Sequence, residues 1–261
     1  MSKARAITWS YGGGTQSAAI AVLIAQGRLP KPERTVMADT SREATETWEY
    51  LDKHVSPLLA SVGLRVEIAP HSLAKCDLYS YKGELLIPAY TANGKLETFC
   101  SGEWKAEVVL RYLRSVGYGP KNPVRTWIGI SLDEKRRAKP QNLKWQQLHW
   151  PLLFDFPLTR AECRHIVLEA GLPEPPKSSC WKCPHRRDPQ WKRLKDFYPA
   201  DFEAACRLDE QIRYEDILSG GSGLWLHESR KPLREVDFKV VLNVHPLFTA
   251  TTGCDSGYCW T

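Results

Sequence analysis

Residues 10–17 read Ser10-Tyr11-Gly12-Gly13-Gly14-Thr15-Gln16-Ser17, and they join a strand expected at 4–11 to a helix expected at 15–26. Three consecutive glycines let backbone N–H groups approach a ligand without interference from Cβ atoms. The start of the following helix adds unpaired N–H groups and a partial positive charge, which favour an anion. The stretch therefore predicts a phosphate-binding loop. The alternative is a tight turn between strand and helix that binds no ligand.

Outward from this loop, the front of the chain alternates strand-like and helix-like segments, a pattern typical of a parallel sheet covered by helices on both faces. Strands are expected near residues 4–11, 35–40, 64–71, 124–131 and 147–152, and helices near 15–26, 44–62 and 101–116. We therefore expect an α/β fold with a Rossmann-like, doubly wound, mainly parallel five-stranded sheet. This nucleotide-binding domain is expected to span residues 1–172.

Two other parts of the chain depart from this alternation. Residues 79–97, with the turn pair Asn93-Gly94, indicate an inserted loop or hairpin. A proline-rich run begins at Pro173 and marks the start of a second, smaller lobe, expected to span residues 173–261. This lobe is expected to be mostly helical, with helices near 189–197 and 199–218 and a cysteine-containing tail.

The composition is that of a globular protein. The 261 residues carry 36 Lys and Arg against 30 Asp and Glu, a formal charge of +6, with 43% hydrophobic and 25% charged residues. These values exclude disordered, collagen-like and coiled-coil chains. No stretch approaches the roughly 18 consecutive apolar residues of a membrane helix, so we expect a soluble, cytoplasmic protein. Basic residues gather at 135–144 and 182–195, which suits a polyanion; the alternative is a solvated helix surface.

Eight cysteines in a reducing compartment indicate metal or redox chemistry rather than disulfides. Cys180 and Cys183, three residues apart, can hold one metal ion or cluster. Cys100, at the start of an expected helix, is the expected third ligand. Either Cys254 or Cys259 in the tail is the fourth, with Cys259 preferred. Four thiolates suit a [4Fe–4S] cluster or Zn²⁺, and the remaining alternative is that no metal binds.

The glycine loop resembles the PP-loop, Ser-Gly-Gly-x-Asp-Ser, of the ATP pyrophosphatase superfamily, in the form found in PAPS (phosphoadenosine phosphosulfate) reductase-like proteins of bacteria and phages. Gly12 stands at the usual serine, for which Ser10 is the candidate substitute, and Gln16 stands at the usual aspartate. Loss of that aspartate removes a carboxylate suited to organising Mg²⁺. Further stretches resemble the family's nucleotide-contacting, Cys-x-x-x-Trp-Lys, Gly-Ile-x-x-Asp-Glu and Tyr-Pro-Leu segments: residues 38–40, 98–105, 128–134 and 150–152.

The resemblance implies a set of site residues. Nucleotide contacts are implied at Ser10, Gly12, Gly13, Gly14, Thr15, Gln16, Ser17, Asp39, Thr40 and Gly129. Catalytic roles are implied at Cys100, Lys105, Asp133 and Glu134. Metal ligation is expected at Cys100, Cys180, Cys183 and Cys259. The implied cofactors are ATP, Mg²⁺ and a [4Fe–4S] cluster, with Zn²⁺ as the alternative.

The expected position of these residues agrees with a general property of doubly wound sheets. Ligands bind beyond the carboxyl ends of the strands, where the strand order reverses. The glycine loop, Asp39 and Gly129 all follow expected strands. In the alternative interpretation, Asp39 only caps a helix and Gly129 only allows close packing.

Three functions remain open at this point. The leading hypothesis is an ATP pyrophosphatase-type enzyme that adenylates a nucleobase or nucleic acid for sulfur insertion, with a cysteine-bound [4Fe–4S] cluster. The second is a PAPS reductase-like oxidoreductase that uses a thiol to release sulfite from a sulfonucleotide. The third is a zinc-stabilised nucleic-acid-binding module without activity. Expected partners are a nucleotide, a DNA or tRNA substrate, a sulfur donor such as a cysteine desulfurase, and a second copy in a homodimer, with no membrane contact.

Overall fold

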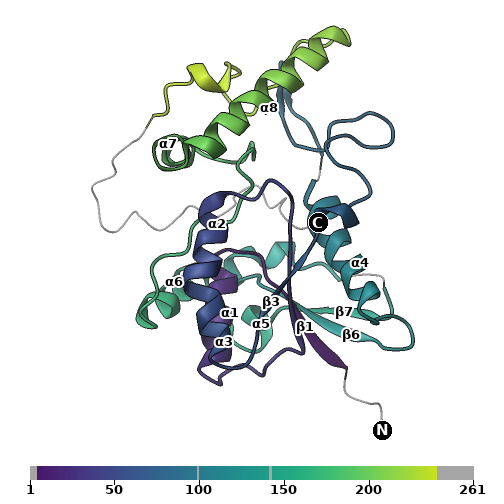
Figure 1. Cartoon of the computed structure of the whole chain (residues 1–261), viewed down its shortest axis with the longest axis vertical. Helices are drawn as coiled ribbons and strands as arrows, with labels where there is room; N and C mark the ends of the chain where they lie inside the picture. The colour runs from purple at the N-terminus through teal and green to yellow at the C-terminus, as the bar shows by residue number, and fades with distance from the viewer. Residues whose placement is uncertain (1–4, 99, 141–142, 240–261) are drawn as a thin grey trace.

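The computed structural model describes residues 5–98, 100–140 and 143–239. Within these ranges, one sheet has the strand order β3-β2-β1-β6-β7, and every neighbouring pair is parallel (Figure 1). Its strands are β1 (Ala6–Ser10), β2 (Arg34–Ala38), β3 (Val66–Ala69), β6 (Val124–Ile128) and β7 (Gln146–His149). The expected five-stranded, doubly wound parallel sheet is confirmed.

Helices cover both faces of this sheet (Figure 1). On one face lie α1 (Thr15–Ala25), α6 (Arg160–Glu169) and a continuous stretch of α2 (Thr45–Tyr50), the π-helical turn η1 (Leu51–Val55) and α3 (Ser56–Ala60). On the other face lies α4 (Glu107–Ser115), which follows a second π-helical turn, η3 (Gly102–Ala106). Residues 15–24 of α1 are all buried, because this helix is apolar on every side and lies between the sheet and its neighbouring helices.

Several predicted strands end earlier than expected, and the one expected at 124–131 ends at Ile128. The strand expected at 147–152 ends at His149, and the short helix α5 (Pro151–Phe154) follows it. Pro151 explains the difference, because proline has no backbone N–H to pair in a sheet and its fixed φ suits the first turn of a helix. The helix α6 was not among the predicted elements.

The inserted segment forms the expected hairpin, with strands β4 (Tyr90–Thr91) and β5 (Gly94–Lys95). It packs together with the C-terminal helices α7 (Asp188–Phe197) and α8 (Pro199–Leu218) in a second hydrophobic core. Fully buried members of this core include Ile87, Trp191 and Leu226. The second core therefore draws on residues from both sides of the boundary predicted at residues 172 and 173.

The strand order reverses between β1 and β6, so the carboxyl ends of these two strands form the topological switch point of the sheet. The glycine loop follows β1, and residues 129–134 with the 3₁₀ helix η4 (Leu132–Arg137) follow β6. A ligand is expected in the crevice at this edge. No helix in the described part of the chain is long and apolar enough to cross a membrane.

Candidate nucleotide and cysteine sites

The glycine loop turns sharply from β1 into α1. The N–H group of Gly12 donates a hydrogen bond to Ser17 Oγ at 2.9 Å, and Gly13 has a positive φ of +74°. The N–H groups of Gly13, Gly14 and Thr15 have no hydrogen-bond partner among the described residues, and no side chain caps α1. Unpaired donors at the N-terminus of an eleven-residue helix are suited to an anion.

The protein's own chain lies over the glycine end of this loop. The Ser178 hydroxyl donates to the Gly12 carbonyl oxygen. A Cβ atom on Gly13 would lie 2.7 Å from Thr47 Cγ2, and one on Gly14 would lie 3.3 Å from Ser178 Cβ. These glycines are therefore also required by packing within the protein. Thr15, at the other end of the loop, lines a cavity.

Gln16 connects the glycine loop to the segment after β6. Its Nε2 group donates to Ser131 Oγ at 3.2 Å and to Glu134 Oε2 at 3.0 Å. Its Oε1 atom accepts a hydrogen bond from Arg160 at 3.4 Å, and the other terminal nitrogen of Arg160 lies 3.5 Å from Thr15 Oγ1. The two sequence stretches expected at the switch point are thus joined by the side chain that replaces the usual PP-loop aspartate.

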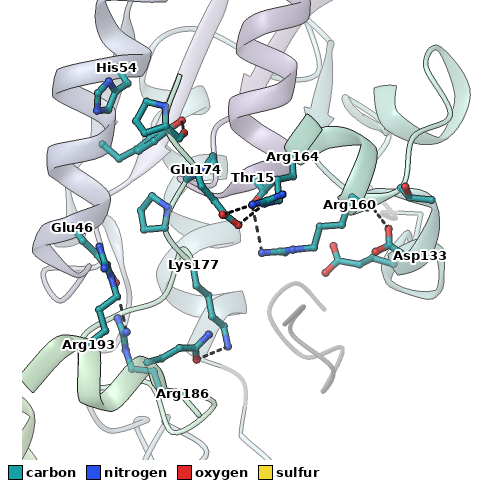
Figure 2. A pocket seen from close by; sticks show the side chains of 18 of the residues that line it. Thr15, Glu46, His54, Asp133, Arg160, Arg164, Glu174, Lys177, Arg186 and Arg193 are labelled. Carbon is teal, nitrogen blue, oxygen red and sulfur yellow. Dashed lines mark hydrogen bonds and ion pairs between the residues drawn. The ribbon is translucent and has the colours of Figure 1, made fainter. Parts of the chain in front are cut away.

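A cavity of about 1250 Å³ opens beside these residues, and nine lysine and arginine side chains and five carboxylates line it (Figure 2). Several cations are neutralised within the protein. Arg164 pairs with Glu174 at 2.7 Å, and Arg193 pairs with Glu46 at 2.9 Å. Arg160 forms no ion pair with a described carboxylate. The surplus of positive charge suits a ligand with several negative charges.

The cysteine pair lies next to the end of β2. The Cys180 Sγ atom lies 3.3 Å from Thr40 Oγ1 and donates to the Glu43 carboxylate at 3.7 Å. Glu43 and Cys180 also form an isolated backbone bridge. The Glu43 carboxylate pairs with Lys105 at 3.3 Å, and the Cys183 N–H closes a turn onto the Cys180 carbonyl at 3.1 Å.

Burial changes the ionisation of the groups in this region. It raises the pKa of the Cys180 thiol to about 12, with a further contribution from Glu43. Burial, followed by the charge of Cys183, raises the pKa of the Cys100 thiol to about 11. Burial lowers the pKa of Lys182 to about 7, against the opposing effect of the Cys180 charge. Both thiols are therefore protonated at neutral pH unless a metal or cation compensates the thiolate.

The cysteine pair lies beside a buried lysine. The Lys182 side chain is 1% exposed, and its Nζ atom has no hydrogen-bond partner among the described residues. This atom lies 3.7 Å from the centroid of the Trp104 ring. A buried cation without a counter-charge is unfavourable, and thiolates at Cys100 and Cys180 would supply that charge. Within the described ranges, however, no three His, Cys, Asp or Glu side chains have the spacing of a metal site.

The remaining predicted residues take several positions. Ser10 is buried at the end of β1, and Asp39 accepts a hydrogen bond from the Ser41 N–H at 2.7 Å. A Cβ atom on Gly129 would be in ordinary contact with α1, so this glycine packs against that helix. Asp133 accepts the backbone N–H of Arg160 at 3.0 Å. Cys254 and Cys259 lie outside the described residues.

Two residues with prominent contacts had no predicted role: Arg160 and Ser178. Their contacts join segments more than 100 residues apart, which periodicity does not indicate. A local signal for Arg160 existed in Thr159 and Glu162, which form a capping box at the start of α6.

Comparisons with known proteins were made at three levels. No protein-family model matches the sequence, and no curated protein matches it. One similar solved structure is phosphoadenylyl-sulfate (PAPS) reductase from Candida auris in its phosphate complex. The similarity covers 69% of this chain and 83% of that chain, with 13% sequence identity and a TM-score of 0.45. The fold assignment rests on the strand order and connections described above.

Proposed function

We propose that this protein is a PP-loop-type enzyme that binds ATP at residues 10–17 and adenylates a nucleobase or nucleic acid for sulfur insertion. One observation carries the proposal: the unpaired N–H groups at the start of α1 lie at the switch point of a doubly wound sheet, beside a cavity with surplus positive charge. Backbone donors fixed in place stabilise charge on phosphates without reorganisation. The geometry therefore supports a phosphorylated ligand above other classes.

The proposed reaction has two steps. A carbonyl oxygen of the base attacks the α-phosphorus of ATP, the bond to the β-phosphate breaks, and pyrophosphate leaves. A nucleophilic sulfur then attacks the activated carbon, the carbon–oxygen bond breaks, and AMP leaves. In this scheme the loop holds the phosphates, and Asp39 and Thr40 contact the nucleoside. Asp133 and Glu134 act near the phosphates.

The cysteines are proposed to hold a [4Fe–4S] cluster, with Zn²⁺ as the alternative. Cys100, Cys180 and Cys183 of the described chain would bind it, with Cys259 as the fourth ligand, and when bound it would supply the sulfur. The buried, unpaired ammonium of Lys182 supports this assignment, because it favours negative charge at the neighbouring thiols. A sulfur donor such as a cysteine desulfurase would restore the sulfur.

The alternative is a PAPS reductase-like enzyme in which a free thiol attacks a sulfonucleotide. The thiolate is the nucleophilic form of cysteine, and burial raises the pKa of both Cys100 and Cys180 well above neutrality. These two thiols are therefore poor free nucleophiles at neutral pH. The thiol that such an enzyme would use is then Cys254 or Cys259 of the tail, and both lie outside the described residues.

The test compares products and metal content. Protein purified without oxygen is incubated with ATP and DNA or tRNA, and separately with PAPS and a thiol reductant. We expect pyrophosphate release from ATP, a brown protein and about four irons per chain. Sulfite release from PAPS would instead support the reductase. Colourless protein with one zinc and no product from either nucleotide would support the non-enzymatic zinc module.

A further inference from the structure

The side chain of Gln16 is arranged to orient an arginine. It is 7% exposed, and its amide is used at both ends: Nε2 donates to Ser131 and Glu134, and Oε1 accepts from Arg160. An aspartate at this position has no N–H group, and its charge would face the Glu134 carboxylate at close range. The glutamine therefore matches its neighbours in a way that the usual aspartate does not.

Arg160 is held at the mouth of the loop but is not neutralised there. It is the first residue of α6, where Thr159 caps the helix and the Arg160 N–H bonds to Asp133 at 3.0 Å. Its guanidinium extends toward Thr15 (Figure 2), with long contacts of 3.4 and 3.5 Å to Gln16 and Thr15. Guanidinium carries five N–H donors in a planar fork that suits phosphate oxygens, so donors remain for a ligand.

A second arginine at the cavity also has an unsatisfied donor. Arg137 lines the cavity with its side chain 10% exposed, and it pairs with Glu134 through NH1 at 2.9 Å. Its buried Nε atom has no hydrogen-bond partner among the described residues. An unpartnered buried donor is unfavourable unless a ligand satisfies it. The cavity therefore presents a second guanidinium, that of Arg137, next to Glu134.

The carboxylates beside the loop are already engaged. Glu134 accepts from Gln16 and pairs with Arg137, and Asp133 accepts the N–H group that begins α6. Mg²⁺ at nucleotide sites is typically held by one or two carboxylates together with phosphates and water. Here these carboxylates bond to the protein's own cations and donors, and the loop itself carries the neutral amide of Gln16 in place of a carboxylate. The residues present do not fit a Mg²⁺ site.

We propose that Arg160, positioned by Gln16, takes the place of Mg²⁺ at the phosphates, so that this site binds pyrophosphate and nucleotides without a divalent cation. The inference rests on the proposed nucleotide site and names the group that recognises the ligand there. Arg160 contacts the ligand, whereas Gln16 acts through Arg160 and is a positioning residue.

The test measures binding of inorganic pyrophosphate and of ATP by calorimetry, each in EDTA and in excess Mg²⁺. For the wild-type protein we expect binding in EDTA that Mg²⁺ does not strengthen. The Arg160→Met variant should bind both ligands about tenfold or more weakly, because charge-assisted hydrogen bonds to the anion are lost. Arg164→Met combined with Glu174→Gln is the matched control: it removes an arginine one turn along the same helix together with the carboxylate that neutralises it, so the net charge of the cavity is unchanged, and it should weaken binding by less than about threefold.

A Gln16→Asp variant tests the positioning role. We expect it to lose binding in EDTA and to regain it with Mg²⁺, because it restores a carboxylate at the loop and withdraws Arg160 into an ion pair. Thermal unfolding of each variant, followed by circular dichroism, separates this effect from loss of the fold. A Gln16→Asp variant that folds and binds pyrophosphate as the wild-type protein does in both conditions would contradict the positioning role.

Measuring both pyrophosphate and ATP distinguishes a failure of this inference from a failure of the proposed function. Arg160-dependent binding of pyrophosphate in EDTA, with no binding of ATP, would retain the inference and overturn the proposed function. Binding of ATP that requires Mg²⁺, with equal affinities for Arg160→Met and the double control variant, would overturn the inference and leave the proposed function standing. Absence of binding for both ligands in both conditions would overturn both.

Discussion

Lys182 shows how a single residue can work against the stability of the metal-free protein. Its ammonium group is buried over the Trp104 ring and has no hydrogen-bond acceptor in the described chain. Burial lowers its pKa to about 7, so the folded state disfavours a charge that the unfolded chain carries up to about pH 10. The same cation would stabilise thiolates at the neighbouring cysteines.

We therefore predict that Lys182→Met makes the metal-free protein more stable by about 1–3 kcal/mol. The gain should be larger at pH 6 than at pH 9. Between pH 7 and pH 10 the unfolded state binds more protons than the folded state, because the pKa of Lys182 is lowered on folding. The stability of the wild-type protein therefore rises across that interval. The stability difference between Lys182→Met and the wild-type protein becomes smaller as a result. Urea unfolding at both pH values measures this. Lys192→Met, at an exposed lysine paired with Asp196, should change stability by less than about 0.5 kcal/mol.

The thiols give a second prediction at the same scale. Because burial raises the pKa of Cys180 to about 12, the native metal-free protein should react with iodoacetamide at Cys180 on the order of a hundredfold more slowly than the urea-unfolded chain at pH 8. Mass spectrometry of the labelled peptides measures the rates. Equal rates in both states would show that the thiol is not protected. The raised pKa also means that stability falls as the pH rises above about 8.5, the value for an unfolded thiol.

Sequence patterns indicated the site residues that follow strands, because the carboxyl ends of parallel strands meet at one edge. Gln16 and Glu134 were selected through the family resemblance, and the structure brings them into contact. Arg160 and Ser178 were not selected. Arg160 reaches Gln16 across 144 positions and Ser178 reaches Gly12 across 166, and such contacts follow from helix packing rather than from any local pattern.

At the scale of elements, the glycine loop has a requirement of its own. Gly13 combines a φ of +74° with a neighbour at 2.7 Å from the position of an added Cβ, whereas Gly83 has a φ of +78° and open space around it. The two positions share the backbone conformation and differ in packing. They form a matched pair that separates conformational strain from steric overlap.

We predict that Gly83→Ala destabilises the protein by about 1–2 kcal/mol, the cost of a left-handed conformation for an L-residue. Gly13→Ala should lower the free energy of unfolding by about 1–3 kcal/mol more than Gly83→Ala does, because Thr47 and the segment that contains Ser178 must move. Chemical unfolding of both variants measures the difference. Equal losses of stability in the two variants would show that the segment above the loop moves aside at no energetic cost.

Most elements were predicted because their patterns are local. Most strands are rich in apolar residues, although β7 (Gln146–His149) is not, and α8 begins and ends where its sequence predicts. The π-helical turns in η1 and η3 were not predicted, because one extra residue per turn leaves little trace in apolar spacing. The helix α6 was missed although Thr159 and Glu162 give a capping signal, because its polar exposed face weakens the helical period.

At the scale of the whole molecule, the two hydrophobic cores do not follow the order of the chain. Leu85 and Ile87 of the insertion pack with Trp191 and Leu226 of the C-terminal part, and Trp104 of the π-helical turn η3 joins the same core. The parallel sheet was predicted correctly. The shared core was not predictable, because nothing in the insertion itself indicates where its apolar side chains pack.

We predict that a chain ending at residue 172 does not form a stable domain. It would leave Leu85, Ile87 and Trp104 without their partners, which exposes apolar surface. We expect stronger fluorescence of a hydrophobic dye and a less cooperative thermal transition than in the full chain. A sharp transition with unchanged near-ultraviolet circular dichroism would instead show that the division at residues 172 and 173 separates two independent domains.

Ser178 and Cys180 stand two positions apart on one stretch of backbone. One end is tied to Gly12 through the serine hydroxyl, and the other is tied to Glu43 through the bridge at the cysteine. Because even an extended chain spans only about 3.3 Å per residue, Ser178 and Cys180 cannot move far independently of each other. A ligand that displaces the Ser178 hydroxyl from Gly12 would therefore shift the Cys180 sulfur. By thermodynamic reciprocity, a group bound to that sulfur would change the affinity of the glycine loop for its ligand.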